Sequence, residues 1–246
     1  MVMTSAQRLS AVAETGTWQL LAGHGWGSDH RCWDGFATAC AERRWDLGRF
    51  DRGYGRFPTA SPGWDGQGRR ALVVNSLGLH LVPAAVLARA DAVVLLASFA
   101  RFVPPGDAGR SLRQALRAMD ERLAAGDVEG LFDEFRQRVA APQPVEHLPA
   151  GVEDGPVPAA GVDRLRRDLD LLGRCDNLPG GFPTTAPVLL VEGADDAIVH
   201  PFSRDDLRQR LPQAQVLSLV GVGHGLLLPG LSEQVLGWLD SLEAGP

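Results

Sequence analysis

A short apolar run that ends in a single serine constrains the fold of this chain more than any other feature. Residues 71–78 read ALVVNSLG, and the serine is Ser76. An apolar run of this length, followed by a turn with a glycine and then a further apolar stretch, predicts a buried strand, a sharp turn and a helix. A serine at such a turn projects beyond the sheet, where its hydroxyl can attack a carbonyl carbon.

The composition is that of a globular protein and excludes several classes. The chain has 246 residues, of which 45% are hydrophobic and 22% charged, which suits one α/β domain with its own core. A net charge of −6 argues against general nucleic-acid binding. No apolar run is long enough for a membrane span, and residues 1–16 lack the apolar block of a secretion signal. Three cysteines without a C-x-x-C pair favour reduced thiols, so we expect a cytoplasmic protein.

The hydrophobic pattern divides the chain into a core and an insertion. Residues 1–99 and 185–246 alternate short apolar runs with amphipathic stretches, which predicts a mainly parallel sheet flanked by helices. Among these elements we expect a helix over 79–89, directly after the serine turn. Residues 100–184 show helical spacing without a convincing strand, and therefore predict an inserted helical cap. Its helices are expected at 111–125, 128–139 and 162–173.

A histidine near the end of the chain is the best candidate for a general base. His224 lies in Gly221-Val222-Gly223-His224-Gly225, directly after the last apolar run. Glycines on both sides predict a loop, which can direct the imidazole towards Ser76 and accept its proton. Without such a partner, Ser76 would be an ordinary helix-capping serine and His224 a surface histidine.

A carboxylate is needed to hold that imidazole in its useful tautomer. Two aspartates, Asp195 and Asp196, follow the predicted strand at 188–192. The spacing G-x-x-D-x-x-V favours Asp196, and Asp195 remains the alternative. The resulting chain order, serine then aspartate then histidine, is that of one large class of hydrolases.

A glycine-rich loop supplies candidate donors for a developing oxyanion. Gly23-His24-Gly25-Trp26-Gly27 follows the first strong strand pattern, and its glycines allow the backbone to approach a ligand closely. In a fold of this class, one N–H comes from this loop and one from the residue after the nucleophile. We therefore expect the backbone N–H groups of Trp26 and Leu77 to form the oxyanion hole.

Taken together, these motifs resemble the α/β-hydrolase superfamily. Within it, the chain most resembles the esterases of biotin synthesis that cleave pimeloyl-[acyl-carrier protein] methyl ester. The likeness lies in the HGWG loop, the SLG turn, Ala97-Ser98 and residues 168–172. The resemblance implies a serine carboxylesterase with Ser76, His224 and Asp196 as its triad, and it implies no metal or organic cofactor.

The resemblance also implies an acyl carrier protein as partner. Such carriers are acidic, and arginines of the cap are candidates for docking them: Arg110, Arg113, Arg117, Arg136 and Arg138. Apolar residues that would line an acyl tunnel are Phe99, Phe102, Phe132, Phe135 and Leu226. Solvated helix faces and plain core packing are the alternatives for these two sets.

Two other functions remain open. The chain can be a hydrolase of another ester, thioester or lactone on the same fold. It can also be an inactive hydrolase fold that serves as a binding module, because Val74 replaces the first glycine of the usual G-x-S-x-G turn.

Overall fold

A computed structural model describes residues 17–66 and 68–242, and its centre is a six-stranded sheet. Every pairing between neighbouring strands is parallel, in the order β2-β1-β3-β4-β5-β6. The strands are β1 (Trp18–Gly23), β2 (Asp46–Phe50), β3 (Arg69–Asn75), β4 (Ala92–Leu96), β5 (Val188–Gly193) and β6 (Gln215–Leu219). Parallel strands place their carboxyl ends along one edge, where α/β sheets bind ligands.

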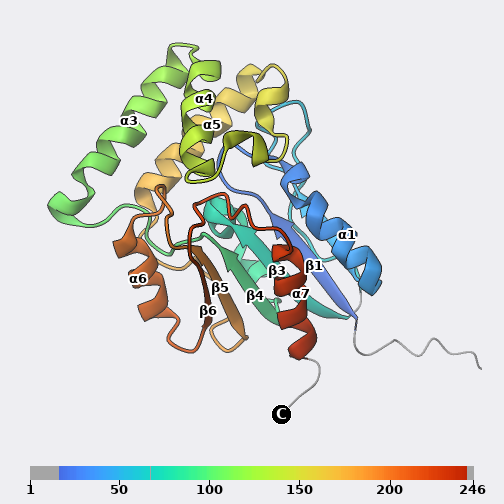
Figure 1. Cartoon of the computed structure of the whole chain (residues 1–246). Helices are drawn as coiled ribbons and strands as arrows, with labels where there is room; N and C mark the ends of the chain where they lie inside the picture. Colours follow the sequence, from blue (N-terminus) through green and yellow to red (C-terminus); the bar gives the residue numbers. More distant parts are fainter. Residues whose placement is uncertain (1–16, 67, 243–246) are drawn as a thin grey trace, which may run out of the picture.

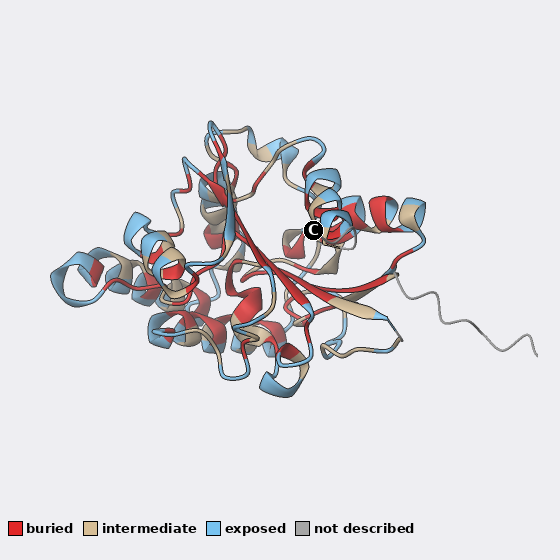
Figure 2. Cartoon of the chain, turned by 90° about the horizontal axis from the view of Figure 1, so that it is seen from below, coloured by how far each residue is buried: buried red, intermediate tan, exposed pale blue. Residues whose placement is uncertain are grey.

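Helices cover both faces of this sheet (Figure 1). Side chains of β3 alternate between two apolar clusters: Ala71 and Val73 pack on the side of α1 and α7, and Leu72 and Val74 on the side of α2 and α6. This alternation follows from the two-residue repeat of a strand, and both faces are buried, as Figure 2 shows. The four helices are α1 (Asp34–Arg43), α2 (Ala84–Leu87), α6 (Pro201–Arg210) and α7 (Leu231–Ser241).

A helical layer lies above the carboxyl edge of the sheet (Figure 1). Between β4 and β5, the described chain forms helices and loops, together with one isolated bridge between Arg101 and Asp176. Its three long helices are α3 (Arg110–Ala124), α4 (Val128–Ala140) and α5 (Ala159–Arg174). Their apolar faces share a cluster with Trp26 and Leu77 of the loops below. The boundaries of a separate cap at residues 100 and 184 stay a prediction.

The segment after Ser76 differs from the expected helix over 79–89. The chain forms a 3-10 helix, η2 (Ser76–Leu81), and only one turn of α-helix in α2. Pro83 separates the two, because proline lacks an N–H and its ring disfavours helical backbone in the preceding residue. Val82 is accordingly extended, with φ −84° and ψ 125°.

The described helices, which lie within residues 17–66 and 68–242, include none with the length and apolar content needed to cross a bilayer. The expectation about a secretion signal concerns residues 1–16, which lie outside the described range.

Candidate active site

Ser76 occupies a strained turn at the carboxyl end of β3. Its φ of 52° is in the left-handed region, which a residue with a side chain seldom adopts. The turn is held by the Ser98 hydroxyl, which donates to the Ser76 carbonyl at 2.8 Å. Gly78 is required here, since a Cβ at this position would lie 2.6 Å from the carbonyl oxygen of Gly23. Strain of this kind persists only where surrounding contacts enforce it, and it is typical of a nucleophile turn.

Val74 fits into this turn without a cavity or an exposed apolar surface. Its side chain is fully buried in the cluster on the α2 and α6 side. In the sheet register it stands opposite Gly23 of β1, beside which the ring of Phe50 fills the space that a Cβ on this glycine would need. The valine therefore replaces the usual glycine while the backbone of Ser76 keeps its left-handed conformation.

His224 and Asp196 are hydrogen-bonded to each other in the loops after β6 and β5. The Nδ1 of His224 donates to Oδ2 of Asp196 at 2.9 Å, and both side chains are buried. The other carboxylate oxygen accepts from the N–H groups of Ile198 and Val199 at 2.8 and 2.9 Å. Asp195 is exposed by comparison. Geometry thus selects Asp196 as the partner of the imidazole.

The surroundings of Asp196 favour its ionised form. Burial raises the pKa of this carboxyl, but His224 and the N–H groups of Val199 and Ile198 outweigh that effect and hold the pKa below its usual value. A charged carboxylate at this place keeps the proton of His224 on Nδ1, so that Nε2 is left as the basic atom.

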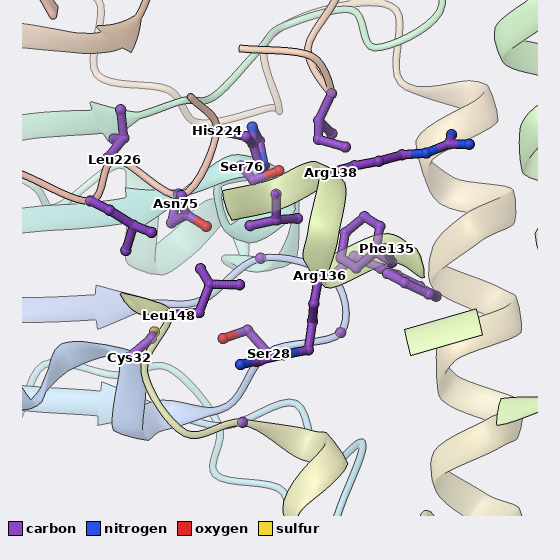
Figure 3. A pocket seen from close by; sticks show the side chains of 18 of the residues that line it. Ser28, Cys32, Asn75, Ser76, Phe135, Arg136, Arg138, Leu148, His224 and Leu226 are labelled. Carbon is purple, nitrogen blue, oxygen red and sulfur yellow. The ribbon is translucent and has the colours of Figure 1, made fainter. Parts of the chain in front are cut away.

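Ser76 and His224 line the same cavity, which has a volume of about 920 Å³. Figure 3 shows the two side chains together in its upper part, with Ser28 and Cys32 below. Among the described residues, no hydrogen bond joins the Ser76 hydroxyl to His224. Contacts of this type often become short only when substrate is bound.

The loop after β1 lies beside the serine turn. A Cβ on Gly25 would be 3.0 Å from the Cβ of Ser76, so the close approach depends on glycine. Trp26 lines the cavity, and its backbone N–H has no acceptor among the described residues. The side chain of Leu77 is fully buried beneath the cap helices. The roles of Trp26 and Leu77 in an oxyanion hole stay a prediction.

A buried polar network that the sequence analysis missed ties this loop to α5. Asp168 is 1% exposed and accepts two hydrogen bonds from the Arg52 guanidinium, both at 2.7 Å, and one from the Tyr54 hydroxyl at 2.6 Å. The backbone N–H of Arg52 donates to Nε2 of His24, so the proton of this ring is on Nδ1 and is donated to the Gly25 carbonyl. In addition, the indole N–H of Trp26 donates to the carbonyl of Leu165 in α5 at 2.9 Å.

His24 makes stability depend on pH with a defined sign. Burial lowers the pKa of this ring in the folded chain, whereas the unfolded chain takes up a proton below about pH 6.5. The free energy of unfolding is therefore expected to be lower at pH 5.5 than at pH 7 because of this group. Urea titrations at both pH values measure it.

The control for this prediction is an exposed histidine. His24→Asn is expected to lose that part of the pH dependence, whereas His147→Asn, at an exposed position, keeps it. Equal pH dependence in His24→Asn and the unmodified protein would contradict the assignment.

The predicted substrate residues separate into two groups. Phe102, Phe135 and Leu226 line the cavity. Phe99 and Phe132 are not among the described residues that line it, and their part in substrate binding stays a prediction. Phe99 is fully buried and stacks on His80, and Phe132 stacks on Trp26 with ring centroids 5.7 Å apart. Each ring contacts a residue that lines the cavity: Phe132 stacks on Trp26, and Phe99 packs against Phe102 with ring centroids 4.9 Å apart.

The five predicted arginines also fall into two groups, one on α3 and one on α4. Those on α3 are exposed: Arg110 pairs with Asp107, Arg113 donates to the Gly106 carbonyl at 2.6 Å, and Arg117 has no ion-pair partner among the described residues. The two on α4 line the cavity instead, as Figure 3 shows. Arg136 is paired with Glu153, whereas Arg138 has no ion-pair partner within residues 17–66 and 68–242.

The cavity is chiefly apolar, and its polar groups lie at a few positions. Within the described ranges, no three side chains of His, Cys, Asp or Glu are grouped as metal ligands would be. Ser76 and His224 are both among the residues that line the cavity, and Asp196 is hydrogen-bonded to His224.

Comparison with known proteins agrees with this architecture. No protein-family model matches the chain, and neither does any curated protein. Solved structures do match over nearly the whole length: an esterase from Thermogutta terrifontis is 18% identical and has a TM-score of 0.65, with 93% of this chain and 91% of that chain covered. An enol-lactonase from Burkholderia xenovorans LB400 is 16% identical, with a TM-score of 0.68 and 92% of both chains covered.

The chain has the α/β-hydrolase fold. An esterase from Exiguobacterium antarcticum shares it at 14% identity, with a TM-score of 0.68 over 94% of this chain and 93% of that one. At these identities the likeness concerns the fold, and function has to be argued from the site. In an α/β-hydrolase fold, the carboxyl ends of β3, β5 and β6 bring Ser76, Asp196 and His224 to one edge of the sheet.

Proposed function

We propose that this protein is a serine hydrolase of carboxylic esters. One arrangement supports the proposal above all. Ser76, on a strained turn, lines the same cavity as His224, and Nδ1 of His224 is hydrogen-bonded to the buried Asp196. A hydroxyl, a base and a carboxylate in this order are the elements of nucleophilic acyl transfer.

The reaction then proceeds in two halves. The Ser76 hydroxyl attacks the ester carbonyl while Nε2 of His224 takes its proton, and Asp196 stabilises the imidazolium. The N–H groups of Trp26 and Leu77 bind the oxyanion, a contribution of roughly 3–4 kcal/mol for each donor. His224 returns the proton to the leaving alcohol. A water molecule, deprotonated by His224, then hydrolyses the acyl-enzyme and releases Ser76.

The cavity has room for an ester with an extended apolar acyl part. Its volume of about 920 Å³ is near the upper end of the range for small-molecule sites, and Phe102, Phe135 and Leu226 give it an apolar surface. Ester and lactone hydrolases are among the proteins that share the fold, as the names of the solved structures state.

As the substrate we propose pimeloyl-[acyl-carrier protein] methyl ester. The support is the sequence resemblance together with exposed arginines on α3, which can attract an acidic carrier while its acyl arm enters the cavity. We also propose that the protein works in the cytoplasm.

Two measurements test the activity and the substrate. A fluorophosphonate probe should label the protein once, at Ser76. Methanol release from the pimeloyl-carrier ester should exceed, in kcat/KM, the hydrolysis of short p-nitrophenyl esters and of simple lactones.

A double variant tests whether α3 docks the carrier. Arg113→Glu together with Arg117→Glu should raise KM for the carrier ester and leave p-nitrophenyl hydrolysis unchanged.

Each rival function corresponds to a different outcome. Rapid hydrolysis of p-nitrophenyl esters or lactones without methanol release would assign another ester or lactone substrate to the same site. Absence of labelling by fluorophosphonate would identify an inactive hydrolase fold that serves for binding.

A further inference from the structure

The loop that carries His224 contacts the end of α4 on one side. The N–H of Gly225 donates to the carbonyl of Val139 at 2.8 Å. A Cβ on Gly223 would collide with the carbonyl oxygen of Ala141, so this glycine allows the cap backbone to lie directly on the loop. The residues on both sides of His224 therefore touch the last turn of α4 or the residue that follows it.

The side chain of Gln143 completes this contact. Its Nε2 donates to the carbonyl of Gly221 at 2.6 Å, and its Oε1 accepts from the N–H of Gly223 at 3.4 Å. One amide group thus joins two backbone groups of the loop, and both of its polar ends are satisfied. With the bond from Gly225 to Val139, the cap holds the chain before and after His224.

The opposite side of the loop rests on the turn that carries Asp196. The N–H of Asp195 donates to the carbonyl of Val222 at 3.0 Å, and Ala194 donates to Leu219 at 2.9 Å. A Cβ on Gly193 would collide with the carbonyl oxygens of Val222 and Gly223. The His224 loop is therefore packed between the core and the cap, and Gln143 makes the side-chain hydrogen bonds to it from the cap side.

From this geometry we infer that Gln143 is a positioning residue for His224. The inference rests on the proposed function, in which Nε2 of His224 must face the Ser76 hydroxyl. Gln143 touches neither reacting group, so it acts by holding the backbone of the loop. Misplacement of a catalytic group by about 1 Å can cost on the order of 100-fold in rate. Partial loosening of the loop is expected to lower kcat about tenfold.

The test uses two substitutions of Gln143 in the full chain. Gln143→Ala removes both hydrogen bonds. Gln143→Glu keeps the size of the side chain and the acceptor but replaces the donor to Gly221 with an oxygen. Gln137→Ala, at an exposed position of α4, is the matched control. We would measure kcat and KM on a p-nitrophenyl ester, the rate of fluorophosphonate labelling, and amide hydrogen exchange over residues 221–225.

A positioning role predicts a specific combination of results. Both Gln143 variants should lose about tenfold in kcat and in labelling rate, with KM changed by less than about twofold. Exchange over 221–225 should be faster in both, and Gln137→Ala should match the unmodified protein. If Gln143→Ala does not fold, the isosteric Gln143→Glu still provides the measurement.

Other outcomes overturn the inference. Full activity of Gln143→Glu would show that the hydrogen bond to the Gly221 carbonyl does not position the loop. Normal kcat in both variants would show that the loop needs no support from the cap. If the unmodified protein is neither labelled nor active on esters, the proposed function fails, and the exchange measurement alone would then report a structural contact without a role in positioning.

Discussion

Ser76→Ala is expected to abolish ester hydrolysis by this protein. Without the hydroxyl, no acyl-enzyme forms, and what remains is the stabilisation that the oxyanion donors and substrate binding provide. A loss in kcat of at least about 10⁴-fold follows from removal of the nucleophile in such a triad. Labelling by fluorophosphonate should disappear with it, because the probe reacts with the same oxygen.

The control for this prediction is a serine outside the cavity. Ser61 lies exposed in the loop before β3, and Ser61→Ala should keep both activity and labelling. Circular dichroism and the melting temperature establish that Ser76→Ala is folded. Hydrolysis that persists in folded Ser76→Ala would mean that another group is the nucleophile, and would refute the proposed mechanism.

Asp196→Asn is expected to reduce kcat roughly 10³–10⁴-fold while the protein remains folded. The amide has the same shape, but it cannot stabilise the imidazolium, and its NH₂ group favours the tautomer with the proton on Nε2. In that tautomer, the atom that should accept the proton of Ser76 already carries one. The activity measured at saturating substrate gives kcat directly.

The neighbouring aspartate provides a matched comparison. Asp195→Asn makes the same chemical change one residue earlier, at an exposed position whose side chain has no hydrogen bond or ion pair among the described residues. We expect it to retain nearly full activity. A greater loss of kcat in Asp195→Asn than in Asp196→Asn would reverse the assignment of the two residues.

Local patterns were sufficient to predict the sheet and the candidate site. The apolar runs at 71–74 and 188–192 are β-strands in the structure, and the last apolar run before His224 is β6. The positions of Ser76, Asp196 and His224 followed from turns and glycines that directly follow these strands. In an all-parallel sheet the carboxyl ends share one edge, so topology converts separate local signals into one site.

Local patterns could not predict contacts between segments that are far apart in the sequence. Asp168 is hydrogen-bonded to Arg52, 116 residues away, and Gln143 to Gly221, 78 residues away. No periodicity or motif indicates either pair. The helix expected over 79–89 is interrupted for a different, local reason: Pro83 lacks an N–H and disfavours helical backbone at Val82, although the apolar pattern continues across both residues.

Neighbouring residues were enough to predict the fold class and the order of Ser76, Asp196 and His224 along the chain, because strand periodicity and glycine turns are local properties. Which of several similar side chains faces the cavity depends instead on the folded arrangement of the whole chain. Phe132 and Phe135 are three residues apart on α4, yet Phe132 packs beneath Trp26 and Phe135 lines the cavity. Their environments differ because burial depends on what the rest of the chain places beside each ring, which no local pattern contains.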